Sequence, residues 1–275
     1  MTRYHSHTTS YLGVSTTCAL LVILLLTLIG SPTLYARDKE GRFIVVIDAG
    51  HGGHDSGAKG KVSYEKNVVL AVSKKVGAKI NELSPQIKVY YSRPDDNFIG
   101  LQDRARFAIK KNADLFVSIH ANASNSHSPS GTETYVLGLH RTEDNLRVAM
   151  KENSAILLED NYSKKYEDFD PTSSESYIIF QFMANKHLEN SLRLAKLVQN
   201  GFKSVSRYDR GVRQAGFLVL REAAMPSVLI EIGFITNREE ERYINSQSGQ
   251  AKIANEIAKA VIEYERQIRR RSGKQ

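Results

Sequence analysis

The chain has 275 residues, of which 41% are hydrophobic and 25% charged, a composition typical of a folded protein. This composition excludes a disordered chain, a collagen-like chain and a coiled coil. The formal net charge of +8 favours an anionic partner. No nucleic-acid partner is expected, because the chain has no Trp and its 13 Tyr and 10 Phe are spread along it instead of forming stacking platforms.

The first 36 residues have the pattern of a secretory signal peptide. A polar, weakly basic start leads into the apolar run at residues 18–29, which suits a signal-peptide core and is too short to span a bilayer as a helix. Ala36 is the expected cleavage point. We therefore expect export across the inner membrane, a periplasmic or cell-envelope location and no stable membrane insertion after cleavage. An uncleaved amphipathic anchor is the alternative.

Cys18 lies in this segment and is the only cysteine of the chain. One cysteine cannot form an intramolecular disulfide or a cysteine-based metal site. A metal bound by the mature chain must therefore be held by His, Asp or Glu side chains.

Beyond residue 36, strand and helix patterns alternate, which favours one α/β domain with a mostly parallel sheet. Apolar runs predict six strands, at residues 43–49, 88–92, 115–120, 132–137, 217–220 and 228–232. Apolar residues at helical spacing predict the main helices at residues 65–83, 101–111, 188–205 and 250–268. We therefore predict a sheet of about six strands flanked by helices, in a catalytic domain that covers residues 37–275.

Residues 140–186 fit this alternation poorly. They contain an acidic amphipathic helix and then a polar loop with Asp170-Pro171, and they are too long for an ordinary connection. We interpret them as a helical insertion. It either decorates the surface or forms a lid or regulatory element over a site.

Polar side chains gather where the predicted strands end. The first strand leads into DAGHGGHDSGAKG, a glycine-rich turn that presents His51 and His54 beyond the carboxyl edge of the sheet. This turn matches neither the dinucleotide-binding pattern nor a phosphate-binding loop. The strand at residues 115–120 also ends in a histidine, His120. Two strands that finish in His at one edge suggest metal ligands, although His120 alone is equally well explained as a core histidine.

A hydrolytic zinc site takes three protein ligands and keeps one position open for water, so a third ligand is needed. Glu65 begins the helix that follows the glycine-rich turn and returns to the same edge of the sheet. An acid in the first turn of a helix is also explained by the helix dipole. Combined with His51 and His120, however, Glu65 completes a site of two histidines and one carboxylate.

Glu231 lies inside an apolar run, PSVLIEIGFITN, where an unpaired buried carboxylate is unfavourable. It must stay protonated or face a positive group such as a metal with its water. The alternative is an edge strand on which Glu231 points to solvent or pairs with Arg221. Arg221 itself either binds a substrate carboxylate through two parallel hydrogen bonds or is an ordinary salt-bridge partner.

Five motifs, in the order IDAGHGGHDSGA, YEKN, FVSIHAN, GTETYVLG and PSVLIEIGFITN, resemble the zinc-dependent N-acetylmuramoyl-L-alanine amidases of the amidase 3 family. The resemblance runs from Ile47 to Asn237. It implies an α/β fold with a six-stranded sheet, one Zn²⁺ ion and hydrolysis of the amide between N-acetylmuramic acid and the L-alanine of the peptidoglycan stem peptide. The residue roles that follow from it are zinc ligation by His51, Glu65 and His120, and acid/base catalysis by Glu231. The expected substrate-binding residues are Asn122 and Arg221.

The inserted segment also resembles a known feature of this family. In members that act at cell division, an inserted helix covers the zinc and places a Glu on it until a partner displaces the helix. Glu152 is our candidate for this residue; the alternative is that the acids of residues 140–186 merely solvate a surface helix. The resemblance further implies a role in cell-wall remodelling or daughter-cell separation, with peptidoglycan as substrate and a degenerate metallopeptidase-like protein of the LytM type as activator.

Two other functions stay open on the residues alone. A zinc carboxypeptidase or endopeptidase that acts within the stem peptide would use a similar site. A non-catalytic peptidoglycan-binding scaffold would keep the fold without turnover, although all four expected metal and catalytic positions are filled.

Overall fold

The computed structural model describes residues 41–183 and 185–272. The predicted signal peptide at residues 1–36, with Cys18 and Ala36, lies outside these residues. None of the helices in the described part of the chain combines the length and apolarity that a membrane crossing requires.

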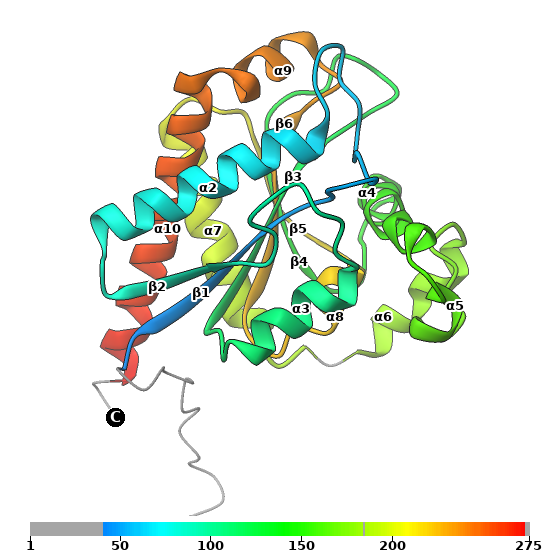
Figure 1. Cartoon of the computed structure of the whole chain (residues 1–275), viewed down its shortest axis with the longest axis horizontal. Coiled ribbons are helices and arrows are strands. Elements are labelled where there is room, and N and C mark those ends of the chain that lie inside the picture. The colour runs from blue at the N-terminus through cyan, green and yellow to red at the C-terminus, as the bar shows by residue number, and fades with distance from the viewer. Residues whose placement is uncertain (1–40, 184, 273–275) are drawn as a thin grey trace, which may run out of the picture. The chain divides into compact units, whose positions relative to one another are not determined.

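A single six-stranded sheet forms the centre of the fold (Figure 1). The strands lie in the order β2-β1-β3-β6-β4-β5. All neighbouring strands pair in parallel except β4 and β6, which are antiparallel. The predicted class, one α/β domain with a mostly parallel six-stranded sheet, is confirmed. The strands are Phe43–Ala49 (β1), Ile87–Tyr91 (β2), Leu115–Asn122 (β3), Thr132–Leu137 (β4), Asp209–Ala215 (β5) and Ser227–Phe234 (β6).

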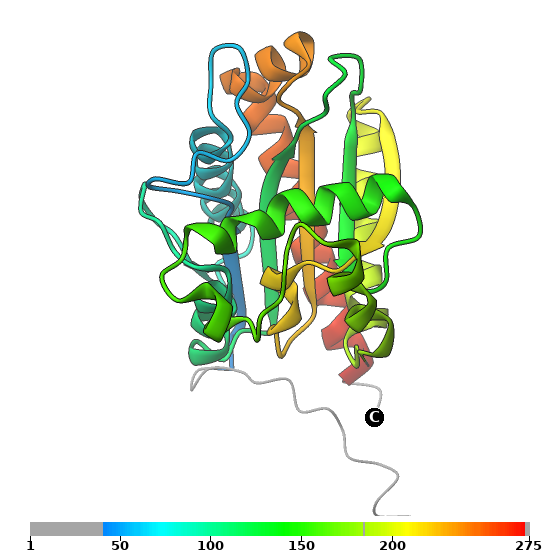
Figure 2. The ribbon, with the colours of Figure 1, turned by 90° about the vertical axis from the view of Figure 1, so that its right-hand side faces the viewer.

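Helices cover both faces of the sheet (Figures 1 and 2). The apolar stripe of α2, which includes Val72 and Ile80, is fully buried, as its helical spacing predicts. One face carries α2 (Glu65–Leu83), α7 (Leu188–Ser204) and α10 (Gln247–Ser272), with α9 (Arg238–Asn245) beside α10. The other face carries α3 (Leu101–Lys110), α4 (Glu143–Asn153) and α8 (Leu218–Arg221).

One predicted strand is wrong. Residues 217–220 form the start of the helical turn α8, in which the N–H groups of Leu220 and Arg221 both donate to the carbonyl of Phe217. A short apolar run is equally compatible with a buried helical turn and a buried strand, so its periodicity could not distinguish them. The sixth strand is instead β5, a polar edge segment with the sequence DRGVRQA.

The insertion contributes to the hydrophobic core. Its elements are α4, the 3-10 turns Ser154–Leu158 and Ser174–Ile178, and the short helices α5 (Tyr162–Lys165) and α6 (Ile179–Phe182). Leu146, Tyr166 and Tyr177 are buried in the same cluster as Tyr135 of β4 and Phe217, the residue that precedes α8. The insertion is therefore not a surface decoration.

The alternation of side chains along the strands places the polar candidates on one face. In the strand register, His120 of β3 lies opposite Glu231 of β6, and Glu231 lies opposite Glu133 of β4. Residues opposite each other point to the same side of a sheet. Because Tyr135, two residues after Glu133, packs in the cluster with α4 and α8, this row lies on their side of the sheet. Figure 2 shows α4, in green, crossing the strands on this face.

Candidate metal centre

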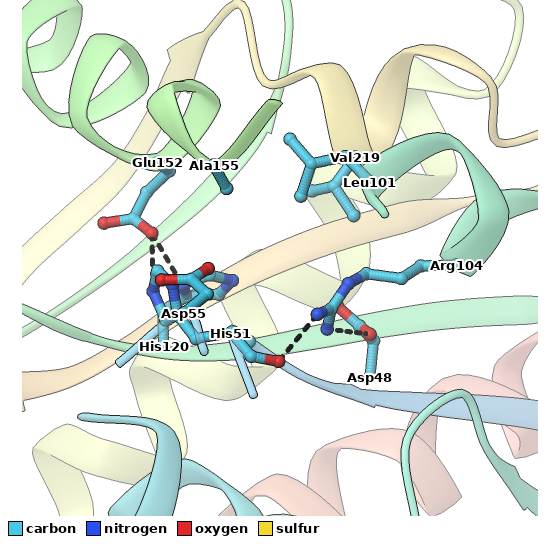
Figure 3. Close-up of a pocket in the computed structure, with 10 residues that line it drawn as sticks. Asp48, His51, Asp55, Leu101, Arg104, His120, Glu152, Ala155 and Val219 are labelled. Atoms are coloured by element: carbon cyan, nitrogen blue, oxygen red, sulfur yellow. Dashed lines mark hydrogen bonds and ion pairs between the residues drawn. The ribbon is translucent and has the colours of Figure 1, made fainter. Parts of the chain in front are cut away.

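Four buried side chains converge beneath the carboxyl-terminal end of α4. His51, Glu65, His120 and Glu152 each offer one ligand atom, and these atoms lie within 4.8 Å of one another. Glu152 Oε2 lies 3.0 Å from His51 Nε2 and 2.9 Å from His120 Nδ1 (Figure 3). Glu65 Oε1 lies 3.2 Å and 3.3 Å from the same two nitrogens. The structure thus brings together the three predicted zinc ligands and the predicted covering glutamate, whereas His54 is exposed and stacks on Phe98.

Glycines make room for the two imidazoles. A Cβ atom at Gly50 would lie 2.4 Å from His120 Cε1, and one at Gly57 would lie 2.5 Å from His51 Cδ2. His51 itself has a φ of 61°, in the left-handed region that a non-glycine residue adopts only at a cost. The glycine-rich sequence is therefore needed for close packing against the imidazole rings.

Two fully buried arginines hold the backbone of this turn. Arg104 donates from Nη1 to the Ala49 carbonyl and from Nη2 to the His51 carbonyl, both at 2.6 Å. Arg93 donates to the carbonyls of Ala49 at 3.1 Å and Gly50 at 3.0 Å. These hydrogen bonds from charged donors fix the strained turn that carries His51. The sequence analysis missed both arginines, since nothing in their local pattern indicates which carbonyls they reach.

The side chains around His51 and Glu65 fix the orientation of these two candidate ligands. His51 Nδ1 lies 2.8 Å from Asp55 Oδ2, so Nε2 is the nitrogen that faces the cluster. Glu65 accepts hydrogen bonds from the backbone N–H groups of Ala58, at 2.8 Å, and Ala121, at 2.9 Å. Metal ligands in proteins are commonly held by such outer partners. Asp55, four residues after His51 in HGGHD, could have been suggested by its spacing.

The donor set fits a zinc ion. His51 Nε2, His120 Nδ1 and Glu152 Oε2 are buried, and among the described residues their close contacts are the ion pairs that they make with one another and with Glu65. Burial lowers the pKa of His120, but the nearby Glu152 carboxylate outweighs this effect and raises the pKa to about 9. Two imidazole nitrogens that face two carboxylates form a site that attracts a cation, and nitrogen and oxygen ligands of this kind are those that zinc takes.

Glu231 is buried beside this cluster. Its side chain is 0% exposed, and both carboxyl oxygens lack hydrogen-bond partners in the described part of the chain. Burial, reinforced by the charge of Glu152, raises its pKa well above the ordinary value. Strand β6 lies between β3 and β4, which excludes the solvent-facing edge position considered for Glu231. Arg221 lies on α8 with Nε 3.1 Å from Glu222 Oε1, and its role in substrate binding stays a prediction.

Glu152 is held in place by its neighbours on α4. The Asn153 side chain donates to the Gly216 carbonyl at 2.8 Å and accepts from the Leu218 N–H at 2.9 Å. Lys151 Nζ lies 2.8 Å from Glu152 Oε1 and 3.7 Å from Glu65 Oε2. The end of α4 is therefore tied to the core next to the cluster. None of these contacts follows from the amphipathic pattern of the helix.

The family model for N-acetylmuramoyl-L-alanine amidase matches residues 45–263. The chain belongs to this family. AmiA of Escherichia coli K12 is 36% identical over 233 residues, which are 83% of this chain and 78% of AmiA. AmiC of E. coli O6:H1 is 35% identical over 237 residues, which are 85% of this chain and 55% of AmiC.

Solved amidase structures have the same fold. The amidase from Clostridium difficile 630 has 32% identity and a TM-score of 0.61, over 81% of this chain and 96% of that one. AmiC2 of Nostoc punctiforme has 31% identity and a TM-score of 0.59, over 82% of this chain and 98% of that one. The protein is therefore a peptidoglycan amidase.

Proposed function

We propose that this amidase uses zinc, held by His51, Glu65 and His120, to cleave the amide between N-acetylmuramic acid and the L-alanine of the stem peptide. The observation that carries the proposal is the convergence of ligand atoms from these three buried side chains, within 4.8 Å of one another, in a chain of this family. Zinc at such a site supplies Lewis-acid polarisation of the amide carbonyl and lowers the pKa of water toward 7.

Glu231 performs the proton transfers in this proposal. As a carboxylate, it accepts a proton from the water that attacks the lactyl carbonyl carbon, and a new C–O bond forms there. It then gives this proton to the amide nitrogen as the C–N bond breaks, which releases the stem peptide with a free amine. Its place opposite His120 in the strand register supports this role.

Glu152 keeps the amidase inactive in the conformation described above. Its carboxylate lies about as close to the two histidine nitrogens as a hydrogen bond allows, at 2.9 and 3.0 Å. A carboxylate in the position where a hydrolytic site needs water excludes that water. Helix α4 must therefore move away before the substrate can be hydrolysed.

An activator protein of the LytM type displaces α4 in this proposal. The insertion offers an apolar surface near α6: Ile178 is 52% exposed, Ile179 51% and Phe182 79%. Neighbouring exposed apolar side chains of this size are typical of protein-binding surfaces. The signal-peptide pattern of residues 1–36 supports export, so the amidase and its activator would meet in the cell envelope, in wall remodelling or daughter-cell separation.

The first test measures zinc content and muropeptide release together, on the chain that starts at Arg37. We expect one equivalent of zinc and little release from the native sequence. Glu152→Ala should keep zinc and raise release strongly, whereas Glu143→Ala, an exposed acid on the same helix, should change neither. Point variants are preferable to deletion of residues 142–176, because that deletion would remove the buried Tyr166 from the core.

Two variants separate the proposed roles at the centre. Glu231→Gln should retain zinc and lose most activity, and His51→Ala should lose both. Loss of zinc in Glu231→Gln would contradict the assignment of Glu231 as acid/base. Zinc binding without cleavage of the lactyl amide by Glu152→Ala would contradict the proposed reaction, and equal activity of the native chain and Glu152→Ala would contradict the inhibitory role of α4.

A further inference from the structure

A second group of charged side chains lies on the same face of the sheet, next to Glu231. Glu133 is 3% exposed, and its Oε1 accepts a hydrogen bond from Asn122 Nδ2 at 2.7 Å. Arg213 Nε lies 2.7 Å from Glu133 Oε2, and Arg210 Nε lies 3.7 Å from Glu133 Oε1. We call these four residues the arginine cluster.

The arginine cluster has more positive charge than its own carboxylate balances. Two guanidinium groups face the single carboxylate of Glu133. Arg213 Nε pairs with this carboxylate, whereas Arg210 Nε is buried, 3.7 Å from it, and has no hydrogen-bond acceptor in the described part of the chain. A buried donor without an acceptor and an unbalanced positive charge are both unfavourable, and together they indicate that a negatively charged group completes the cluster.

Helix α4 covers this cluster. Arg213 Nη1 donates to Asn145 Oδ1, near the start of α4, at 3.2 Å. Asn145 is a neutral side chain on the helix whose other end carries Glu152 over the two histidines. Displacement of α4 would therefore remove the amide from Arg213 at the same time as it uncovers the metal centre.

The distance between Arg213 and Glu231 suits a short acidic peptide. Strand β5 is two strands, or about 10 Å, from β6, and Arg213 lies level with Tyr135, two residues along β4 from the row of Glu133 and Glu231. The backbones at Arg213 and Glu231 are therefore about 12 Å apart. Two residues of extended peptide span at most about 7 Å. The Arg213 side chain reaches back along β4 to Glu133, whose backbone is one strand spacing, about 4.8 Å, from that of Glu231, and this closes most of the gap. A carboxylate two residues beyond the cleaved amide can therefore reach Arg213.

We propose that Arg213, supported by Arg210, binds a carboxylate of the stem peptide about two residues beyond the scissile amide. Glu133 and Asn122 act as positioning residues, since their hydrogen bond holds the carboxylate that orients Arg213. The inference rests on the proposed function, because it names the substrate group recognised next to the same catalytic centre. Arginine suits this task because its planar group matches a carboxylate with two parallel hydrogen bonds.

The test compares two soluble muropeptides that differ only at the second residue of the stem, which carries either a free carboxylate or a carboxamide. With Glu152→Ala as parent, we expect kcat/KM to be about 10- to 100-fold higher for the acid, as for a hydrogen-bonded charge pair. Arg213→Met should lower the ratio of the two kcat/KM values to about 1, mainly by raising KM for the acid. Arg213→Lys should restore part of it. Arg147→Met, an exposed arginine on α4, should keep the full preference.

Binding of the released stem peptide provides a readout that needs no turnover. Calorimetry should show the acidic peptide binding more tightly than its carboxamide to the parent, and equally weakly to Arg213→Met. An unchanged preference in Arg213→Met, or an equal loss for both peptides, would overturn the inference. If the parent cleaves neither muropeptide, the proposed function fails, while the binding experiment still decides the role of Arg213.

Discussion

The substitution Arg104→Met tests whether the buried arginine beneath the glycine-rich turn stabilises the fold as its contacts indicate. Arg104 is 1% exposed and donates to Asp48 Oδ1 at 3.0 Å, in addition to the carbonyls of Ala49 and His51. Asp48 is 0% exposed. The variant would therefore leave a buried carboxylate without its charged partner, while the Ser118 hydroxyl still donates to that carboxylate.

Breaking a buried ion pair by removing one partner costs about 3–5 kcal/mol. A domain of this size loses about 2–4 °C of Tm for each kcal/mol, so Tm should fall by roughly 6–20 °C. Burial alone would raise the pKa of Asp48, but Arg104 holds it below its ordinary value. In the native chain this carboxylate therefore contributes stability above about pH 4, which is lost as the pH falls. The deficit of Arg104→Met should accordingly be largest at neutral pH and shrink as the pH falls, first because the unpaired Asp48, whose pKa burial raises, becomes protonated in the variant. Below about pH 4 it shrinks further, because the native carboxylate loses its charge as well.

The assay is urea unfolding in the presence of a chelator, so that changes in metal binding do not contribute. Arg106→Met is the matched control, since Arg106 lies on the same helix and its side chain is 60% exposed; it should change stability by less than about 0.5 kcal/mol. The double variant with Asp48→Asn should recover at least about 1 kcal/mol relative to Arg104→Met, because the unpaired charge is gone. A loss below about 1 kcal/mol in Arg104→Met, or no recovery in the double variant, would refute the reasoning.

Three further predictions follow from contacts at the candidate metal centre. Gly50→Ala places a Cβ atom 2.4 Å from His120 Cε1, so zinc affinity measured by titration should fall at least about tenfold; unchanged affinity would contradict the close-packing argument. Asn153→Ala removes hydrogen bonds to Gly216 and Leu218 worth about 1–3 kcal/mol, so basal muropeptide release should rise and α4 amides should exchange hydrogen faster; native-like exchange would count against it. Chelation should lower Tm, and zinc at 100 times its Kd should restore about 2.7 kcal/mol; a metal-independent Tm would exclude zinc as a stabilising ligand.

The sequence predicts those parts of the fold that depend on local apolar patterns. Strand β1 and helix α2 have the predicted bounds, because a continuous buried run and a helical stripe are strong local signals. Strand β5 was missed because an edge strand needs few apolar residues, and DRGVRQA has almost none. Its polar residues form an ordered strand only by pairing with β4, a contact that no local pattern reveals.

The candidate site likewise has residues that a local pattern predicts and residues that only tertiary contacts bring together. His51 and His120 could be paired from sequence because His51 follows β1 and His120 lies near the carboxyl end of β3, its parallel neighbour, so both reach the same edge of the sheet. Arg213 could not be assigned, since its strand was missed and its partner Glu133 lies far away in the chain. Glu152 was named as the covering glutamate from the resemblance to the family and not from its own pattern, because its position over the histidines depends on where α4 packs on the sheet.

The burial of α4 has a consequence for how two ligands influence each other. Displacing the helix would expose Leu146 and Ala149, now 4% and 0% exposed, at a cost of about 2–4 kcal/mol. An activator that binds only the displaced form would therefore bind the native chain about 30- to 1,000-fold more weakly than a chain already open. By thermodynamic reciprocity, a substrate fragment that also requires the open form would raise the affinity for the activator by the same factor as the activator raises the affinity for the fragment. Peptidoglycan and activator would then be cooperative ligands even though they bind different surfaces.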